Sequence, residues 1–201
     1  MSLGTVLLTG VGRERGIGAG LALGLAEAGW DLSLSYWGRY DQRVGYEQGP
    51  ADPERVADRC RALGRTVDLL PGDLADPDVP AQLAQAANRR GDLTAVVMSH
   101  TESVDSSILD TTVQSWDRHY AVNARAVWLL IKAFTEQLPA SVIESQSGRI
   151  VALTSDHTAH NLPYGSSKGA LDRIVVAAAI ELAEYGVRAN VINQDRSTPA
   201  G

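Results

Sequence analysis

Several residue types are scarce in this chain, and each scarcity excludes a class of protein. Cysteine occurs once, at Cys60, so no internal disulfide can form. No apolar run approaches the roughly 20 residues that span a bilayer, and the N-terminus lacks the basic start and cleavage site of a signal peptide. We therefore expect a cytoplasmic protein with no membrane partner.

Positive charge is limited as well. The formal net charge of the 201 residues is −6 and no long basic segment occurs, so we expect no nucleic-acid partner. This net charge does not exclude a local basic pocket for a phosphate. Lysine occurs only at Lys132 and Lys168, among sixteen arginines. The length and the ordinary apolar and charged fractions predict one domain over residues 1–201 with a substantial core.

Short apolar runs alternate with segments of helical spacing along the whole chain. Strands are expected over residues 3–9, 32–36, 66–70, 93–98, 149–154 and 187–192. Helices are expected over 17–28, 53–63 with Asp52 as N-cap, 76–87, 113–138 and 164–185, and residues 38–50 are expected to be an irregular polar connection. This order requires parallel strands with right-handed crossovers. The sequence therefore predicts a doubly wound α/β fold, Rossmann-like, with six strands and helices on both faces.

A tyrosine and a lysine four residues apart form the most informative local pattern. Tyr164 and Lys168 lie in a predicted helix, which brings positions i and i+4 onto one face. An ammonium beside a phenol favours the phenolate form, so this pair can exchange a proton with a substrate oxygen. Taken alone, the pair is also compatible with a half-buried tyrosine beside a solvated lysine.

A glycine-rich segment follows the first predicted strand. The run Thr9-Gly10-Val11-Gly12-Arg13-Glu14-Arg15-Gly16-Ile17-Gly18 leads into a predicted helix. Glycines let the backbone approach a pyrophosphate, and the N–H groups at a helix start attract it. The segment therefore predicts a phosphate-binding loop, although a merely tight turn remains the alternative.

The end of the second predicted strand bears on which dinucleotide binds. In NAD-binding proteins a carboxylate at this place accepts a hydrogen bond from the ribose 2′-hydroxyl. No carboxylate occurs at the end of this strand, and Trp37 and Arg39 follow instead. Arg13 and Arg15 lie in the facing loop, so a 2′-phosphate would meet cations. We expect NADP to be the cofactor, with NAD the less favoured one; the alternative is that these arginines face solvent.

Together these residues resemble the short-chain dehydrogenases/reductases of the classical type over essentially the whole chain. The glycine segment is similar to the family's Thr-Gly-x-x-x-Gly-x-Gly motif, and Asp73-Leu74 is similar to the pair that holds the adenine. The positions that match the family's catalytic tetrad are Asn123, Ser155, Tyr164 and Lys168. The positions assigned to the cofactor are Gly10, Arg13, Arg15, Gly16, Ile17, Gly18, Trp37, Arg39, Asp73, Leu74, Ser99, Tyr164 and Lys168.

The resemblance implies an NADP-dependent oxidoreductase that moves hydride between the nicotinamide and a small carbonyl or alcohol substrate. Tyr164 would move the proton, Ser155 would bind the carbonyl oxygen and Lys168 the nicotinamide ribose, and Asn123 would hold a water that relays protons. Structural alternatives are that Ser155 only ends a strand and that Asn123 only satisfies a helix kink. The family also implies a homodimer through the helices at 113–138 and 164–185, for which Leu129, Leu130, Val175, Val176 and Ala179 are candidates.

The chain departs from the family pattern at four places. Five residues, not three, separate Gly10 from Gly16, and Met98-Ser99-His100 replaces an Asn-Ala-Gly motif. The segment between Ser155 and Tyr164 is short and contains His157 and His160, which lack further ligands for a metal, so no metal site is expected. After the sixth strand the family's Pro-Gly turn and substrate loop have no counterpart before Gly201. A non-catalytic dinucleotide-binding or interaction protein on the same fold therefore remains the alternative. The sequence is compatible both with part of a longer protein and with a short variant of the family.

Overall fold

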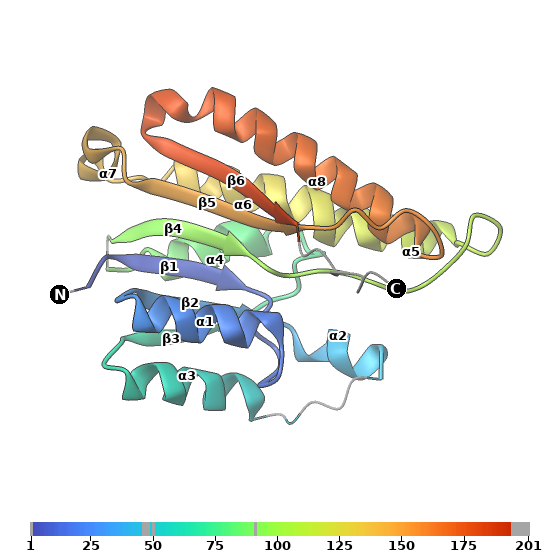
Figure 1. Cartoon of the computed structure of the whole chain (residues 1–201), viewed down its shortest axis with the longest axis horizontal. Helices are drawn as coiled ribbons and strands as arrows, with labels where there is room; N and C mark the ends of the chain where they lie inside the picture. The colour runs from blue at the N-terminus through green and yellow to red at the C-terminus, as the bar shows by residue number, and fades with distance from the viewer. Residues whose placement is uncertain (1, 46–48, 50, 91, 194–201) are drawn as a thin grey trace, which may run out of the picture.

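The computed structural model describes residues 2–45, 49, 51–90 and 92–193. Its strands form one sheet in the order β3-β2-β1-β4-β5-β6, and every neighbouring pair is parallel, as predicted. The strands are β1 (Thr5–Thr9), β2 (Asp31–Tyr36), β3 (Val67–Pro71), β4 (Leu93–Met98), β5 (Gly148–Thr154) and β6 (Val187–Asn193). In Figure 1 the arrowheads of the strands point to one side of the molecule, where α2 and the start of α8 lie.

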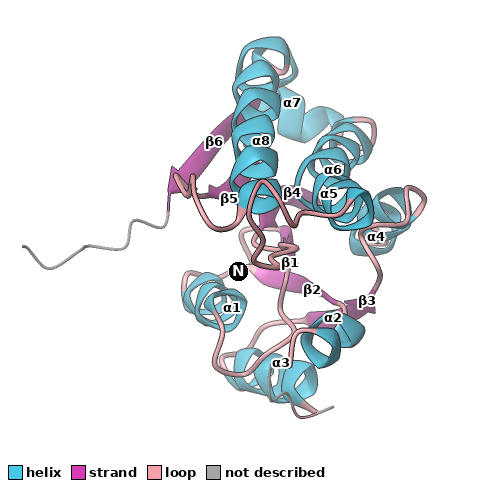
Figure 2. Cartoon of the chain, turned by 90° about the vertical axis from the view of Figure 1, so that its right-hand side faces the viewer, coloured by secondary structure: helices cyan, strands magenta, loops and turns pink. Residues whose placement is uncertain are grey.

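Helices cover both faces of the sheet, as Figure 2 shows in the view turned by 90°. The helices are α1 (Ile17–Glu27), α2 (Gly38–Arg43), α3 (Asp52–Ala62), α4 (Val79–Ala87), α5 (Val113–Tyr120), α6 (Ala126–Thr135), α7 (Ala140–Ser145) and α8 (Leu162–Glu181). Helices α1 and α3 pack on one face, and α4, α6 and α8 pack on the other. No helix of the described residues is long and apolar enough to cross a membrane.

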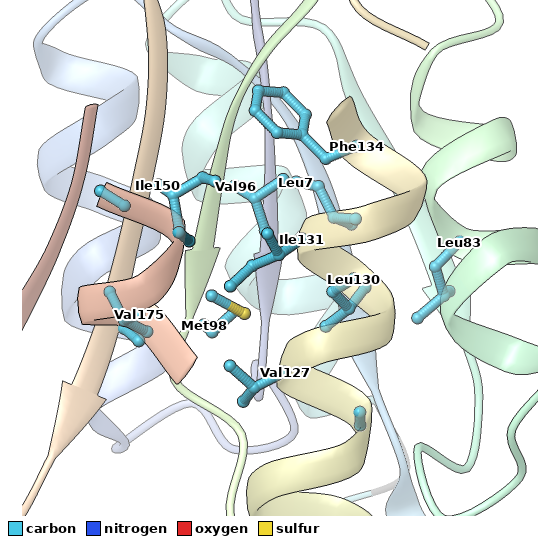
Figure 3. Close-up of a cluster of buried hydrophobic side chains, with 14 of the residues drawn as sticks. Leu7, Leu83, Val96, Met98, Val127, Leu130, Ile131, Phe134, Ile150 and Val175 are labelled. Atoms are coloured by element: carbon cyan, nitrogen blue, oxygen red, sulfur yellow. The ribbon is translucent and has the colours of Figure 1, made fainter. Parts of the chain in front are cut away.

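The larger of the two cores lies between the middle strands and the α4, α6 and α8 layer. Successive side chains of a strand point to opposite faces of the sheet, so that every second side chain points to this layer. Figure 3 shows the central side chains of this cluster: Leu7, Leu83, Val96, Met98, Val127, Leu130, Ile131, Phe134, Ile150 and Val175. The opposite core is built on alanines of α1, whose small side chains let that helix approach β1 and β2 closely.

The expected helix over 113–138 is not a single α-helix. It consists of α5, a π-helical turn at Ala121–Arg125 and α6, which ends at Thr135. The turn accommodates one extra residue, which periodicity alone does not predict because the apolar face continues on both sides. Two short helices, α2 and α7, were also missed, and α2 lies inside the segment expected to be irregular.

Helix α8 begins at Leu162, two residues before the predicted start, and the starts of α3 and α4 also differ from the prediction. Helix α3 includes Asp52, and Ala51 is the N-cap. The carboxylate of Asp52 instead accepts a hydrogen bond from the backbone N–H of Glu14, at 3.3 Å, so a tertiary contact takes the place of the cap. Helix α4 begins at Val79 because the Asp76 carboxylate accepts from the N–H of Asp78, at 3.0 Å, and closes a turn first.

The topology places a ligand site between β1 and β4. Strand order reverses there, because the crossovers from these two strands run in opposite directions and leave a crevice beyond their carboxyl ends. Residues 194–201, which lie where the family's Pro-Gly turn would be expected, are outside the described residues.

Candidate active site

Two adjoining cavities lie beyond the carboxyl ends of the strands. The first extends past β1, β2 and β3 toward α2, and the second lies over β5 and the start of α8. Both cavities are partly open to solvent. The residues that line both are Gly10, Arg13, Ser99 and Thr101. The two cavities therefore form one groove that crosses the reversal point of the sheet.

Two glycines of the loop after β1 are required by close backbone approach. Gly10 has φ +83°, and a Cβ there would lie 2.7 Å from the backbone N of His100. A Cβ at Gly18 would collide with the carbonyl oxygen of Gly10. At Gly16, the N-cap of α1, the nearest atom to a Cβ is 3.5 Å away, so sterics do not require glycine there. Gly16, Ile17 and Gly18 all line the second cavity.

The extra residues of this loop extend toward α3. The N–H of Glu14 donates to Asp52, and the Glu14 carboxylate lies 3.4 Å from Arg55. The side chain of Arg13 lines both cavities, whereas Arg15 is exposed and lines neither. The structure therefore brings one of the two predicted loop arginines to the groove.

Tyr164 and Lys168 share the start of α8 and both line the second cavity. The Nζ of Lys168 donates to the Leu153 carbonyl at 2.8 Å and lies 5.9 Å from the centroid of the Tyr164 ring. Burial lowers the pKa of Lys168 from 10.5 to about 8, and the nearby Asp172 carboxylate opposes this shift. An ammonium held beside the phenol is the arrangement that a proton-exchanging pair needs.

Two hydroxyl groups lie at the end of β5, and the structure brings only that of Thr154 to the second cavity, because Ser155 lines neither cavity. Ser155 is half-buried, and its Oγ accepts a hydrogen bond from the N–H of His157 at 3.2 Å. Thr154, which sequence reasoning missed, lines the cavity, and its Oγ1 is buried without a partner among the described residues. The His157 ring meets the Tyr164 ring edge-on at 6.1 Å between centroids, so the shortened segment lies against the tyrosine.

Asn123 lies in the π-helical turn and is fully buried. Its Nδ2 donates to the Glu102 carbonyl and to Ser167 Oγ, each at 2.9 Å, and its Oδ1 accepts from the Glu102 N–H at 2.7 Å. These bonds connect the segment after β4 to α8. Asn123 lines neither cavity.

The first cavity contains most of the residues assigned to the adenosine half of the cofactor. Its lining includes Trp37, Asp73, Leu74 and Ser99. Arg39 is exposed, lies 5.5 Å from the Trp37 ring centroid and lines a neighbouring hollow. Four of the five residues predicted for the adenosine half thus line this cavity, and Arg39 does not.

Several charged residues of this wall were missed from sequence. Glu102 is 2% exposed, and both of its carboxylate oxygens lie 2.6 Å from Arg43 Nη2. Arg118 pairs with Glu102 at 3.3 Å and with both oxygens of Asp73 at 3.0 and 3.2 Å. Asp41 is also buried in this wall, beside Arg13. Nothing local marks these residues, because their partners are distant in sequence.

His100, at the third position of the departed Asn-Ala-Gly motif, is buried in the same wall. Its Nδ1 lies 2.6 Å from Thr9 Oγ1 and its Nε2 lies 3.1 Å from the Val122 carbonyl. Burial, with the Lys168 charge as a smaller cause, lowers the pKa of His100 to about 3, so the ring is neutral. It therefore joins β1 to the π-helical turn without adding a charge. No group of three metal-binding side chains occurs among the described residues.

Known proteins share this architecture and sequence pattern. Residues 10–196 match the family model described as enoyl-(acyl carrier protein) reductase. An L-rhamnose 1-dehydrogenase (NAD(P)(+)) of Sphingomonas sp. (strain SKA58) is 26% identical over 196 residues, which cover 94% of this chain and 70% of that protein.

Solved structures agree in fold. A putative short-chain alcohol dehydrogenase from Sinorhizobium meliloti 1021 has a TM-score of 0.81 at 24% identity, covering 100% of this chain and 76% of that one. A metagenomic short-chain oxidoreductase in complex with NADP has a TM-score of 0.79 at 25% identity, covering 96% and 82%. With the model match over residues 10–196, these findings establish that the chain belongs to the short-chain dehydrogenase/reductase family of NAD(P)-using oxidoreductases.

Proposed function

We propose that this protein is an NADP-dependent oxidoreductase that transfers hydride between the nicotinamide and the carbon of a small carbonyl or alcohol substrate. The observation that supports it is that Tyr164 and Lys168 line the same cavity as the glycine loop. A proton-exchanging pair thus faces the place where a dinucleotide would end. A protein that only binds a dinucleotide could use Lys168 to hold the ribose, but it would have no need of the Tyr164 hydroxyl beside that lysine.

The backbone of the groove is suited to a dinucleotide. Side chains on Gly10 and Gly18 would fill the space by which the loop approaches a ligand, and the N-terminus of the 11-residue α1 points N–H groups at it. We assign the pyrophosphate to Gly16, Ile17 and Gly18, the adenine side to Asp73, Leu74 and Ser99, and the nicotinamide ribose to Lys168. When bound, the nicotinamide supplies or accepts the hydride.

The protein's own groups handle the proton and the substrate oxygen. During reduction the Tyr164 hydroxyl donates its proton to the substrate oxygen as the carbonyl carbon is reduced, and the reverse reaction returns it. The Lys168 ammonium stabilises the phenolate that forms. A hydroxyl at the end of β5, from Ser155 or from Thr154, donates to the substrate oxygen. Asn123 holds the segment after β4 against α8 and in this way fixes the part of α8 that carries Lys168.

The preference for NADP rests on Arg13, which lines the groove, and on Arg39, which follows the end of β2. Ser35, Tyr36 and Trp37 end β2 and begin the next segment without a carboxylate. A 2′-phosphate would make charge-assisted hydrogen bonds to these guanidinium groups. Asp41, which is buried beside Arg13, works against this preference.

Binding and turnover test the proposal separately. Titration of the purified protein with NADPH and NADH, followed by protein fluorescence, should give saturable binding, tighter for NADPH. Assays on a panel of ketones, aldehydes and secondary alcohols should then give nucleotide turnover with at least one of them. Failure to bind either nucleotide would refute the proposal, and binding without turnover on the whole panel would favour the non-catalytic alternative.

We further propose a homodimer that uses α5, α6 and α8. Trp128, Val176 and Ile180 are 52, 49 and 74% exposed on these helices, and Trp116 stacks on Tyr120 beside them. Such a concentration of large exposed apolar side chains marks an interaction surface. Two of the candidates named from sequence, Leu130 and Val175, are instead buried in the core. Periodicity located the helices but did not separate their sheet-facing residues from their outer ones.

A further inference from the structure

A buried carboxylate lies beside the loop arginine that we assign to the 2′-phosphate of NADP. Asp41, on α2, is 4% exposed, and its Oδ1 lies 3.3 Å from the Nε of Arg13 in the glycine loop. Both residues line the first cavity, next to the end of β2. The structure therefore pairs the groove's loop arginine with a carboxylate of the protein itself.

The neighbouring cations are engaged with other acids. Arg118 is shared between Asp73 and Glu102. The Nη2 of Arg43 donates to both carboxylate oxygens of Glu102, each at 2.6 Å. A phosphate would thus compete with carboxylates at Arg43 and Arg118, whereas Arg39 lies over the Trp37 ring. At Arg13 the competitor is Asp41, and the side chain of Arg13 is 38% exposed, so a ligand can reach it.

We propose that the Asp41–Arg13 ion pair sets the choice between NADP and NAD, because the Asp41 carboxylate holds the guanidinium that a 2′-phosphate would bind. This inference rests on the proposed function. NAD, with a 2′-hydroxyl, leaves the pair intact. NADP must take Arg13 from Asp41, which leaves the buried carboxylate without its cation and favours its protonated form. Asp41 is accordingly a specificity-determining residue.

The surroundings of Asp41 support proton uptake. Burial raises the pKa of Asp41, Arg13 opposes that shift, and Asp52 on α3 adds to it. The other charged groups near it are Arg39 and Arg43 on its own helix and Asp73, Glu102 and Arg118 across the cavity. When a phosphate takes Arg13, the opposing cation is neutralised and the pKa of Asp41 rises further. NADP binding should therefore carry a proton that NAD binding does not.

A double-mutant cycle tests this directly. Dissociation constants for NADP⁺ and NAD⁺ are measured by calorimetry for the wild type, Asp41→Asn, Arg13→Ala and the double variant. Asp41→Asn should tighten NADP⁺ by about tenfold, the order expected for one charge-assisted contact released, and change NAD⁺ by less than about twofold. In the Arg13→Ala background the same change should have no effect on NADP⁺. Asp58→Asn, an exposed acid of α3 paired with Arg61, is the matched control and should change neither.

A second measurement needs no variant and covers the case in which Asp41→Asn does not fold. Calorimetry of wild-type NADP⁺ binding near pH 7, in two buffers of different ionisation enthalpy, should show net proton uptake, and NAD⁺ binding should show none. The 2′-phosphate itself titrates at about pH 6, and cations that bind it lower its pKa, so its own contribution is a release of protons and net uptake must come from the protein.

The outcomes separate this inference from the proposed function. If neither nucleotide binds the wild type, the proposed function fails. If both bind, but Asp41→Asn leaves the ratio of the NADP⁺ and NAD⁺ dissociation constants unchanged, or NADP⁺ binding takes up no more protons than NAD⁺ binding, the role of Asp41 is overturned. A tighter NADP⁺ complex in Asp41→Asn that depends on Arg13 establishes it.

Discussion

Lys168 illustrates how a single residue can serve the site at a cost to the fold. Its side chain is 3% exposed, and its described hydrogen bond is to one backbone carbonyl, that of Leu153. Burial of an ammonium with so little compensation lowers its pKa to about 8. The same burial keeps this charge, which lies 5.9 Å from the centroid of the Tyr164 ring, out of bulk water, where it would be screened.

We therefore expect Lys168→Met to stabilise the fold while it removes activity. At neutral pH the free energy of unfolding should rise by about 1–3 kcal/mol, since a pKa unit corresponds to about 1.4 kcal/mol and the lost hydrogen bond offsets part of the gain. In the unfolded chain the lysine titrates near 10.5, above its folded value of about 8, so between these values the unfolded state binds more protons. The deficit of the wild type is thus complete below pH 8 and shrinks as pH rises toward 10.5.

Urea denaturation of both proteins at pH 7 and at several values up to pH 10 measures this difference. A variant that is less stable than the wild type at pH 7, or a difference that does not change with pH, would contradict the assignment of Lys168 as a buried, destabilising charge.

Tyr164 is the second residue at which chemistry and packing separate. Tyr164→Phe removes one hydroxyl from the cavity and keeps the ring and its edge contact with His157. Turnover should fall by about 10²–10⁴-fold or more, the usual effect of losing a general acid/base, while the NADPH dissociation constant stays within about twofold. Steady-state assays and fluorescence titration measure the two quantities. Tyr185→Phe, near the far end of α8, is the matched control and should keep full activity; a fully active Tyr164→Phe would disprove the mechanism.

At the scale of elements, α1 shows why the glycine loop carries glycines at particular places. Gly18 lies in the first turn of the helix against the backbone of Gly10, whereas a Cβ on Gly24, later in the same helix, would have no atom within 4 Å. The first glycine is needed for the approach of loop and helix. The second is needed for neither contact nor conformation.

These two positions form a matched pair for mutation. Gly18→Ala should destabilise the protein by about 1–3 kcal/mol, as overpacking does, and weaken NADPH binding because the loop must move. Gly24→Ala should stabilise it by about 0.5–1 kcal/mol through helix propensity and leave binding unchanged. Thermal denaturation and nucleotide titration measure both effects. If the two variants had equal stability and equal affinity for NADPH, the close approach of loop and helix would not be required for nucleotide binding.

The π-helical turn is the element that joins the two halves of the groove. It places Asn123 where its amide can bond the Glu102 backbone and Ser167 together. It also presents the Val122 carbonyl to His100. π-Helical turns of this kind are frequent at functional sites because they direct side chains that a regular helix cannot. Here the turn connects the wall that carries Glu102 to the helix that carries Tyr164 and Lys168.

At the scale of the whole molecule, the outer faces of α5, α6 and α8 carry the apolar surface that we assign to a dimer. Light scattering at micromolar concentration should give a mass near twice 21.4 kDa. Trp128→Glu places a charge in that surface and should give a monomer that keeps its fold by circular dichroism. Leu109→Glu, at a position that is 96% exposed outside these helices, should remain dimeric. A monomeric wild type would refute the proposal.

The alternation of apolar strands and helices was enough to predict the sheet, its parallel strands and the helices on both faces. The reason is that strand and helix periods are local properties of sequence. The positions of Tyr164 and Lys168 on one face, and of Gly10 and Gly18 at the turn, follow from the same local rules. These features are visible in the sequence because the residues that create them are neighbours along the chain.

Tertiary structure alone decided which charges meet. Arg13 and Arg15 are nearly equivalent in sequence, yet one lines the groove and the other is exposed, because the loop extends to Asp52 on α3. Asp41 lies in a segment expected to be irregular, and only the packing of α2 buries it beside Arg13. Glu102 likewise acquires its arginines from elements that are distant along the chain. Electrostatic pairing depends on distance and burial, which many remote contacts set together, whereas periodicity depends on the next few residues.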